Sequence, residues 1–355
     1  MQNMEKYYKT QMNLEMQKIY EEYSDRVYNK ISCNRKDSGL IFHYTSAEGF
    51  YNIITNKKLF FTDVAFLNDS TETVNIITTF LKALKEIEGV IEEEYLEKLK
   101  KLMELGDFED MVFGSEEGVD LNRYFILACS YQKDSLNMWN YYTKGKDSDW
   151  GYNIAFDEEE LVDSIFQLNH KNYGEKMQLC YGRIVYDEQE KKELICDFLI
   201  GLNNVWLLAR TEKDKNNLLL CIKNIIKWLS IFFKHECFAM EEEYRMVVTL
   251  PYHELTDYFE QRETKKECLY KTRFTNNMFT PYIKMRFRPE GIKGVCMNPL
   301  SEKYTTEFRY RNDIRTVDLI GYKDVLQYGV HEFLRVNGYH LNESQIQRSE
   351  IPLRY

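Results

Sequence analysis

The sequence predicts an α+β domain with a bent, mixed central sheet and helices packed around it. Short apolar runs of strand type recur along the chain, separated by helical stretches of unequal length. The 355 residues are 44% hydrophobic and 15% aromatic, which suffices for a substantial core. The strands and helices do not alternate around a GxGxxG loop, so the pattern does not indicate a doubly wound dinucleotide-binding sheet.

The N-terminal segment, residues 1–36, is expected to form an amphipathic helix, because apolar residues recur at helical spacing between positions 4 and 33. Its apolar face either packs on its own domain or pairs with another copy of the chain in a homo-oligomer. Residues 37–355 then form a single α+β domain. Within that domain, 188–233 is a helical insertion with long apolar faces.

A strand–helix–strand unit opens the domain. Residues 40–44 are a short apolar strand, and Thr45 or Ser46 caps the helix that follows. That helix ends at 56–58, and a second strand covers 59–62.

The remaining elements follow from hydrophobic periodicity and capping residues. Further strands are expected at 124–130, 151–156, 177–186, 236–250, 282–287 and 292–297. Further helices are expected at 69–87, 91–105, 134–142, 157–168, 302–311 and 322–336. The acidic stretch 106–120 reads as a surface loop, and 349–355 as an extended tail.

Composition narrows the class of partners. The net charge of −10 argues against general attraction to nucleic acid or to anionic membrane, although it permits a local basic patch. No apolar run approaches the roughly 20 residues of a membrane helix, and the polar start lacks the core of a signal peptide. A cytoplasmic protein without membrane contact is therefore expected. The eight cysteines form no CxxC pair, and no P-loop, HExxH or GxSxG motif is present.

Polar residues at the end of the first strand form the first candidate site. His43 lies beside Thr45 and Ser46, and an imidazole next to hydroxyls can hydrogen-bond a ribose diol or a phosphate. The alternative is a histidine that is satisfied by a backbone carbonyl.

Two later stretches supply further polar groups. Residues 68–72, which include Asn68, either cap a helix or line a site after a strand. Ser130 and Tyr131 follow a buried strand, with Trp139 close behind, so the aromatic side chains either stack on a planar ring or pack in the core.

The strand around 238–248 concentrates charge. In a strand, Glu241, Glu243 and Arg245 fall on one face. Burial of three charges is costly unless they have partners or a function. The alternatives are a solvated edge strand with a Glu–Arg ladder and a carboxylate aimed into a cleft, with Arg245 fixing its neighbour. Such a carboxylate stabilises positive charge on a sugar carbon or acts as a general base.

These pieces together resemble the prokaryotic domain-of-unknown-function 2971 family over roughly residues 40–355. The order and number of the matching pieces carry the resemblance. They are 42–45, 67–69 with Glu72, 129–130 with Trp139 and Tyr142, 151–152 with Phe156, Phe238 with 241–245, and 349–354.

That family is more remotely similar to ADP-ribosyltransferases of the histidine–tyrosine–glutamate type, and the resemblance implies NAD as substrate. It implies that His43 holds the adenosine-side ribose, assisted by Thr45 or Ser46, and that Tyr131 is a candidate for stacking on nicotinamide. Glu243 would orient the nicotinamide ribose and stabilise an oxocarbenium-like transition state, while Glu241 would support it or orient the acceptor. The middle tyrosine of the type is not unique here. It is Tyr124, Tyr131, Tyr141 or Tyr142.

Three functions are consistent with these residues. The leading one is an NAD-dependent ADP-ribosyltransferase or NAD glycohydrolase, an effector or toxin in phage defence with a protein or nucleic-acid acceptor. The second is a nuclease that holds a divalent metal with Asp69, Glu72, Glu241 and Glu243. The third is a nucleotide sensor without turnover. For the leading function, His43, Tyr131 and Glu243 are expected to line one cleft. The expected catalytic residues are Glu243, Glu241 and Arg245, and the expected NAD-binding residues are His43, Thr45, Ser46, Asn68, Ser130 and Tyr131.

Overall fold

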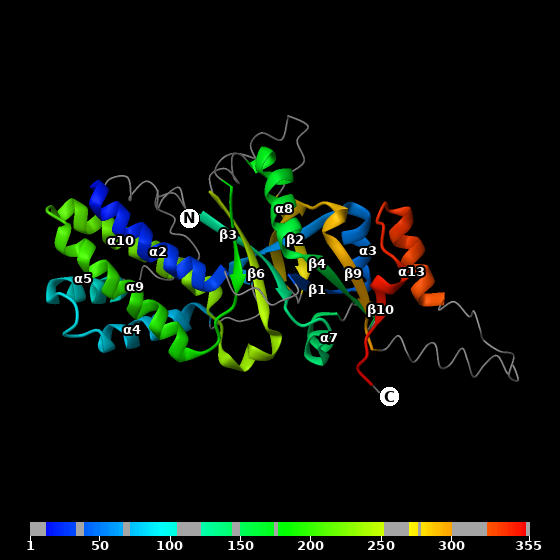
Figure 1. Ribbon diagram of the computed structural model, residues 1–355, viewed down its shortest axis with the longest axis horizontal. Coiled ribbons are helices and arrows are strands. Elements are labelled where there is room, and N and C mark those ends of the chain that lie inside the picture. Colours follow the sequence, from blue (N-terminus) through cyan, green and yellow to red (C-terminus); the bar gives the residue numbers. More distant parts are fainter. Residues whose placement is uncertain are drawn as a thin grey trace, which may run out of the picture.

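The computed structural model shows a mixed α/β fold with an open, mixed sheet (Figure 1). It describes residues 12–32, 39–66, 72–104, 122–143, 150–173, 177–251, 270–275, 278–299 and 325–352.

The strands of the described residues join into one ten-stranded sheet. They are β1 (Leu40–Ser46), β2 (Lys58–Asp63), β3 (Asn122–Ser130), β4 (Gly151–Asp157), β5 (Gln178–Arg183), β6 (Glu243–Pro251), β7 (Tyr270–Thr275), β8 (Met278–Arg286), β9 (Ile292–Met297) and β10 (Ile346–Arg348). Their order is β10-β9-β4-β1-β3-β2-β8-β7, with β6 added to β3 and β5 added to β6. β10 and β9 are parallel, while the other pairs are antiparallel.

Helices cover both faces of this sheet. They are α2 (Leu14–Ser32), α3 (Ala47–Asn56), α4 (Glu72–Glu86), α5 (Glu93–Glu104), α7 (Leu136–Tyr142), α8 (Glu158–Tyr173), α9 (Glu188–Leu208), α10 (Glu212–Phe232) and α13 (Val325–Val336). In Figure 1, α2, α4, α5, α9 and α10 gather at the left, and α3 and α13 lie at the right. None of the described helices is long and apolar enough to cross a bilayer.

Each face of the sheet has its own core. On one face, Phe125 and Tyr244 pack with apolar side chains of α3, α8 and α13. On the other, Ile126 and Val247 pack with side chains of α2, α4, α5, α9 and α10. α7 covers a separate part of this second face, where its apolar side chains meet Phe42. The central strands are therefore buried on both sides over most of their length.

The sheet divides at the central strand β3. One edge of β3 pairs with β6 at every position from Asn122 to Ser130. Its other edge is shared, because β2 pairs near the start, at Ile126, and β1 pairs only at the end, where Phe42 lies opposite Ser130. We call the stretch of this edge between the two pairings the fork, where β1 and β2 part on either side of Ala128.

The N-terminal helix packs on its own chain. The Tyr20 ring meets Phe198 of α9 edge-on at 6.4 Å between ring centroids. Gly201 permits this approach, since a Cβ there would lie 2.2 Å from the Tyr23 ring. Of the two uses expected for this helix, packing on its own domain is the one observed. Pairing with another copy stays a prediction.

Most predicted elements are present in the described residues, and three differ. The strand predicted at 236–250 begins only at Glu243, after a 3-10 helix over Glu236–Glu241. The strands β7 and β10 were not predicted. The helix expected at 302–311 and the loop expected at 106–120 lie outside the described residues.

Candidate active site

The charged strand is an interior strand of the sheet. β6 lies between β3 and β5, so the solvated edge strand is wrong. Glu243 and Arg245 are 6% and 2% exposed. Charges this deep in a sheet persist only with partners, because removing them from water costs several kcal/mol per ion.

Glu241 lies beside Glu243, but it does not belong to the strand as predicted. It ends the 3-10 helix, and Glu242 follows in the left-handed conformation with φ of 41°. His235 caps the start of the same helix by accepting a hydrogen bond from the Cys237 amide. The period-two argument for Glu241 is therefore wrong, whereas its grouping with Glu243 is correct.

Five side chains form a connected network, which we call the carboxylate cluster: Lys234, Glu241, Glu243, Arg245 and Tyr142. The Lys234 ammonium donates to Glu241 Oε2 at 2.6 Å and to Glu243 Oε2 at 2.9 Å. Arg245 Nε donates to Glu243 Oε1 at 2.6 Å, and the Tyr142 hydroxyl donates to Glu241 Oε1 at 2.6 Å. Two carboxylates thus face two cations, and a phenol from α7 closes the network.

The network fixes the charge state of Glu243. Burial alone would raise the pKa of this carboxyl, but the Arg245 and Lys234 charges outweigh burial and hold the pKa below its usual value. Burial also opposes the charge of Lys234, yet the neighbouring carboxylates keep its pKa raised. Burial, followed by the bond to Glu241, raises the pKa of the Tyr142 phenol. Glu243 is therefore an anion at neutral pH, suited to electrostatic stabilisation rather than to proton donation.

Ser130 supports the cluster through the backbone. It lies opposite Glu243 in the sheet and is fully buried. Its hydroxyl donates to the Glu241 carbonyl at 2.6 Å and accepts from the Gln132 amide at 3.0 Å. Ser130 therefore holds the turn that presents Glu241.

The sheet is open to solvent next to the cluster. Ala128 is exposed, although it belongs to the central strand β3 and lies opposite buried Arg245. Alternation places Ala128 and Ser130 on the same face as Glu243 and Arg245. Ala128 therefore gives this face of the sheet a solvent-exposed position beside the cluster.

His43 lies at the fork. Its ring Nδ1 is 3.0 Å from the Ala128 carbonyl, which assigns the Nδ1–H tautomer and leaves Nε2 as an acceptor. Burial lowers the pKa of His43 despite that bond, and the Arg273 charge lowers it further, so the ring is neutral at pH 7. The expected alternative of a histidine bound to a backbone carbonyl is thus observed.

The expected single cleft of His43, Tyr131 and Glu243 does not form as predicted. His43 lies opposite Ile154, whose side chain belongs to the core under α3, α8 and α13. Tyr131 packs edge-on against Tyr244 of the same core, at 5.7 Å between centroids. The His43 side chain in β1 and the Tyr131 side chain just after β3 are therefore directed to the face opposite to Glu243.

Thr45 and Ser46 both contact the first turn of α3. Ser46 is the N-cap of the two candidates, since its hydroxyl accepts from the Gly49 amide at 3.1 Å. Thr45 packs against Gly49, where a Cβ would lie 2.1 Å from the Thr45 hydroxyl oxygen. Asn68 lies outside the described residues.

Replacement of Ser46 by alanine is expected to lower the free energy of unfolding by about 1 kcal/mol, because the Gly49 amide loses its acceptor. Urea denaturation measures this change, and Ser46→Asp, which restores a capping oxygen, should recover most of it. Unchanged stability together with weakened nucleotide binding would instead assign Ser46 to a ligand.

Sequence reasoning missed Lys234 and Ala128. Lys234 follows the end of α10, and although it is buried, nothing in its local sequence distinguishes it from a surface lysine. Among the described residues, no three His, Cys, Asp or Glu side chains gather in a way that could hold a metal ion. Asp69 of the alternative metal site lies outside them.

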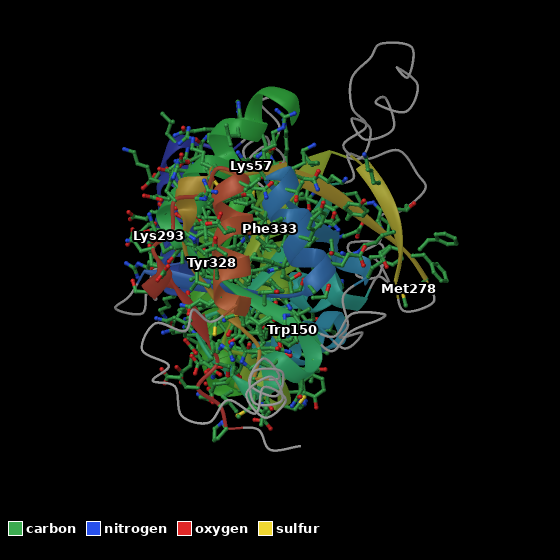
Figure 2. The ribbon with its side chains drawn as sticks, turned by 90° about the vertical axis from the view of Figure 1, so that its right-hand side faces the viewer. Lys57, Trp150, Met278, Lys293, Tyr328 and Phe333 are labelled. Carbon is green, nitrogen blue, oxygen red and sulfur yellow. The ribbon has the colours of Figure 1, made fainter. Side chains whose placement is uncertain are left out.

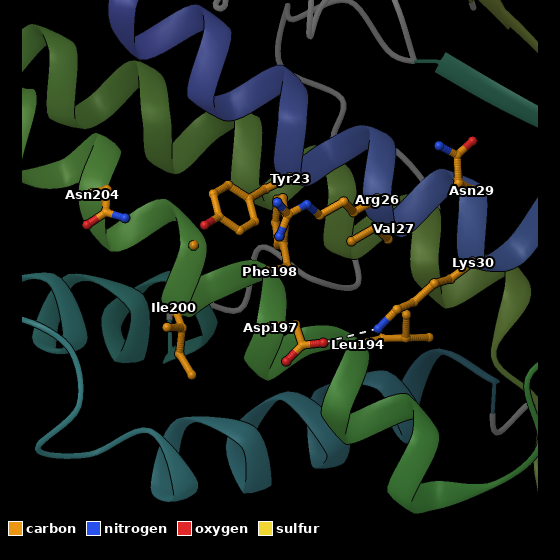
Figure 3. Close-up of a pocket in the computed structure, with 11 residues that line it drawn as sticks. Tyr23, Arg26, Val27, Asn29, Lys30, Leu194, Asp197, Phe198, Ile200 and Asn204 are labelled. Atoms are coloured by element: carbon orange, nitrogen blue, oxygen red, sulfur yellow. Dashed lines mark hydrogen bonds and ion pairs between the residues drawn. The ribbon is translucent and has the colours of Figure 1, made fainter.

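A hollow of about 560 Å³ lies elsewhere, between α2 and α9 (Figure 3). Lys30 on its wall pairs with Asp197 at 3.1 Å. None of its lining residues belongs to the carboxylate cluster or to the predicted site.

Comparison with protein families finds a match to one part of the chain. The family described as "Protein of unknown function (DUF2971)" matches residues 138–246. This segment begins in α7, ends in β6 and contains every member of the carboxylate cluster. No curated protein and no solved structure matches the chain. Residues 138–246 are thus similar to the DUF2971 family of proteins of unknown function, which agrees with the predicted resemblance over that part of the chain.

Proposed function

We propose that the chain cleaves the nicotinamide–ribose bond of NAD, as an ADP-ribosyltransferase or an NAD glycohydrolase. The observation that carries the proposal is an ionised carboxylate, Glu243, on the same sheet face as exposed Ala128. Cleavage needs an anion near the sugar carbon that becomes positive, and a carboxylate held in a site of low dielectric supplies it.

The reaction breaks the bond between ribose C1′ and the nicotinamide nitrogen, and the bonding electrons leave with nicotinamide. Positive charge then develops at C1′, where Glu243 stabilises it. Water or an acceptor group forms the new bond to C1′ and gives up a proton. Because the anion interacts most strongly with the transition state, it lowers the barrier rather than merely binding NAD.

The other members of the cluster take supporting roles in this proposal. A ribose hydroxyl takes the place of the Tyr142 phenol on Glu241, which is 9% exposed. Lys234 and Arg245 are positioning residues that hold Glu243 from two sides. The contact with Glu241 favours Tyr142 as the middle tyrosine of the transferase type.

The proposal extends to the fold but not to His43. The fork at Ala128 supports a likeness to the ADP-ribosyltransferase fold, because it opens the sheet beside the catalytic strand. His43 is directed to the opposite face of the sheet, so the contact with the adenosine ribose that the resemblance implies is not part of the proposal. An effector or toxin role in phage defence belongs to this proposal and rests on the family resemblance alone.

A side chain that fills the space above Ala128 tests the proposal. The full chain is incubated with NAD and cell extract, and nicotinamide release is followed. Ala128→Phe is expected to slow release at least about tenfold by obstructing the substrate, while Ala128→Ser keeps the parental rate. Both variants should keep the parental melting temperature, since Ala128 is exposed.

Two outcomes would overturn the proposal. The first is the absence of nicotinamide release from the parent chain with NAD and extract. The second is a parental rate in a folded Ala128→Phe variant, which would place any NAD chemistry away from this sheet face.

A further inference from the structure

One arm of the sheet, formed by β2, β8 and β7, carries cations and aromatic rings on a single face. Phe60 lies opposite Lys284, and Thr62 lies opposite Tyr282. Tyr282 in turn lies opposite Lys271. Residues that lie opposite each other in neighbouring strands share a face. We call this the basic–aromatic face. Its cations are Lys58, Lys271, Arg273, Lys284 and Arg286, and its rings are Phe60 and Tyr282.

The charge of this face contrasts with that of the whole chain, which is −10. No Asp or Glu occupies this face within the described strands β2, β7 and β8. A local concentration of cations on an acidic protein indicates an anionic partner bound at that place rather than bulk attraction.

The rings and cations of the face contact each other. The Phe60 and Tyr282 rings stack at 4.6 Å between centroids. The Lys284 ammonium lies 5.1 Å from the Phe60 ring centroid. The Arg273 guanidinium lies 5.7 Å from the Tyr282 centroid, and its Nη2 donates to the Thr62 hydroxyl at 3.0 Å. The Arg273 head is therefore oriented over the sheet instead of moving freely in solvent.

The face remains accessible. Arg273 and Arg286 are exposed, Phe60 and Lys284 are half-buried, and Tyr282 is 8% exposed. The β7–β8 hairpin also ends in exposed apolar side chains, of which Phe279 is 70% exposed, and Met278 lies at the outer edge in Figure 2. Exposed aromatic side chains beside cations are a feature of surfaces that bind a partner.

We propose that the basic–aromatic face binds single-stranded nucleic acid. Cations along a sheet face follow the phosphates, and the half-buried Phe60 ring between them stacks on unpaired bases, with buried Tyr282 supporting that ring by stacking against it. An acidic peptide would use the cations alone. Rings interleaved with cations suit a ligand that alternates charge with planar groups. The contacts are not base-specific, so the face accepts DNA or RNA of varied sequence.

The face continues towards the proposed NAD site. Thr62 lies opposite Ile126 of β3, and Ala128 follows two residues later on the same side of the strand. Nucleic acid bound on this arm therefore extends to the sheet beside the carboxylate cluster. We assign it the role of ADP-ribose acceptor, a role that rests on the proposed function.

Fluorescence anisotropy with labelled 20-nucleotide oligo-dT and oligo-U tests the binding, with the full chain and no NAD present. The double variant Arg273→Glu/Lys284→Glu is expected to weaken binding at least about tenfold and to flatten the dependence of affinity on salt. The matched control is Lys18→Glu/Arg26→Glu, which makes the same change in net charge on exposed positions of α2. The control should stay within about twofold of the parent at equal salt.

A second variant separates stacking from charge. Phe60→Leu keeps an apolar side chain under Tyr282 but removes the ring, and it should weaken oligonucleotide binding several-fold with the charge unchanged. The Arg273→Ala/Lys284→Ala variant repeats the charge test if the glutamate variant melts below the assay temperature.

The proposal is overturned if the parent chain binds neither oligonucleotide at about 50 mM salt. Equal weakening by the two charge-reversal variants also overturns it, because bulk charge then explains the binding. Binding to phosphatidylserine vesicles without binding to oligonucleotides would assign the face to a membrane. Since the assay contains no NAD, its failure leaves nicotinamide release untouched, and the converse also holds.

Discussion

Arg245→Met is expected to lower the free energy of unfolding by about 3–5 kcal/mol, because it leaves a buried carboxylate without its closest cation. Arg245 is 2% exposed and bonds Glu243 through Nε at 2.6 Å and through Nη2 at 3.2 Å. Its Nη1 also donates to the Ile231 carbonyl at 2.5 Å, and that carbonyl loses its donor. Urea denaturation at pH 7 measures the loss.

A neighbouring ion pair supplies the control for this prediction. Arg183, on the adjacent strand β5, pairs with Glu190, and its side chain is 18% exposed against 40% for the glutamate. Because water screens such a pair, Arg183→Met should cost about 1 kcal/mol or less. If the two arginine variants lose equal stability, burial of the cluster is not what makes Arg245 important.

A double-mutant cycle identifies the cause. The double variant Arg245→Met/Glu243→Gln should lose less free energy of unfolding than the sum of the losses of the two single variants. The reason is that the double variant removes the buried carboxylate together with its cation. The pH dependence follows from the lowered pKa of Glu243, whose stabilisation is present above the unfolded-state value of about 4.3. It is lost as the pH falls through the folded-state pKa. The stability difference between the parent and Glu243→Gln should therefore shrink below about pH 4.

Local chemistry made the first strand–helix–strand unit predictable. Ser46 caps α3 because a side-chain oxygen satisfies a free amide at a helix start, which any sequence with this spacing allows. The αL residue Glu242 was not predictable in the same way. A glutamate rarely adopts φ above zero, and the Ser130 hydroxyl that bonds the preceding Glu241 carbonyl belongs to another strand.

The composition of the site depends on contacts between distant segments. Lys234 meets Glu241 through a turn after α10, and no period in the sequence encodes that meeting. Alternation fixes which residues of one strand share a face, but only register fixes which face meets which neighbour. Ser130 therefore joins Glu243, while His43 does not. The sequence of β7 is only weakly apolar and did not predict a strand. Its strand conformation depends on pairing with β8.

Glu243→Gln is expected to slow nicotinamide release about 100- to 1,000-fold, the range for losing one preorganised electrostatic contact with a transition state. Glutamine keeps the size of the side chain and removes the negative charge. The charge matters most when C1′ becomes positive, so kcat should fall while KM changes little. Single-turnover release of nicotinamide from labelled NAD measures the chemical step.

The adjacent glutamate is the matched control. Glu242 accepts from the Gln132 amide group at 3.1 Å and contributes no atom to the carboxylate cluster. Glu242→Gln makes the same chemical change one residue away and should leave kcat within about twofold of the parent. Circular dichroism at the assay temperature establishes that both variants are folded, which matters because Glu243→Gln also disturbs a buried ion pair.

The comparison of the two variants separates catalysis from stability. If folded Glu243→Gln keeps the parental kcat, the cluster only stabilises the sheet, and the proposed NAD chemistry loses its anion. If Glu241→Gln raises KM while Glu243→Gln lowers kcat, Glu241 holds the ribose and Glu243 stabilises the transition state. That division is expected from the structure, since Glu243 binds both cations, whereas Glu241 offers the oxygen that Tyr142 occupies.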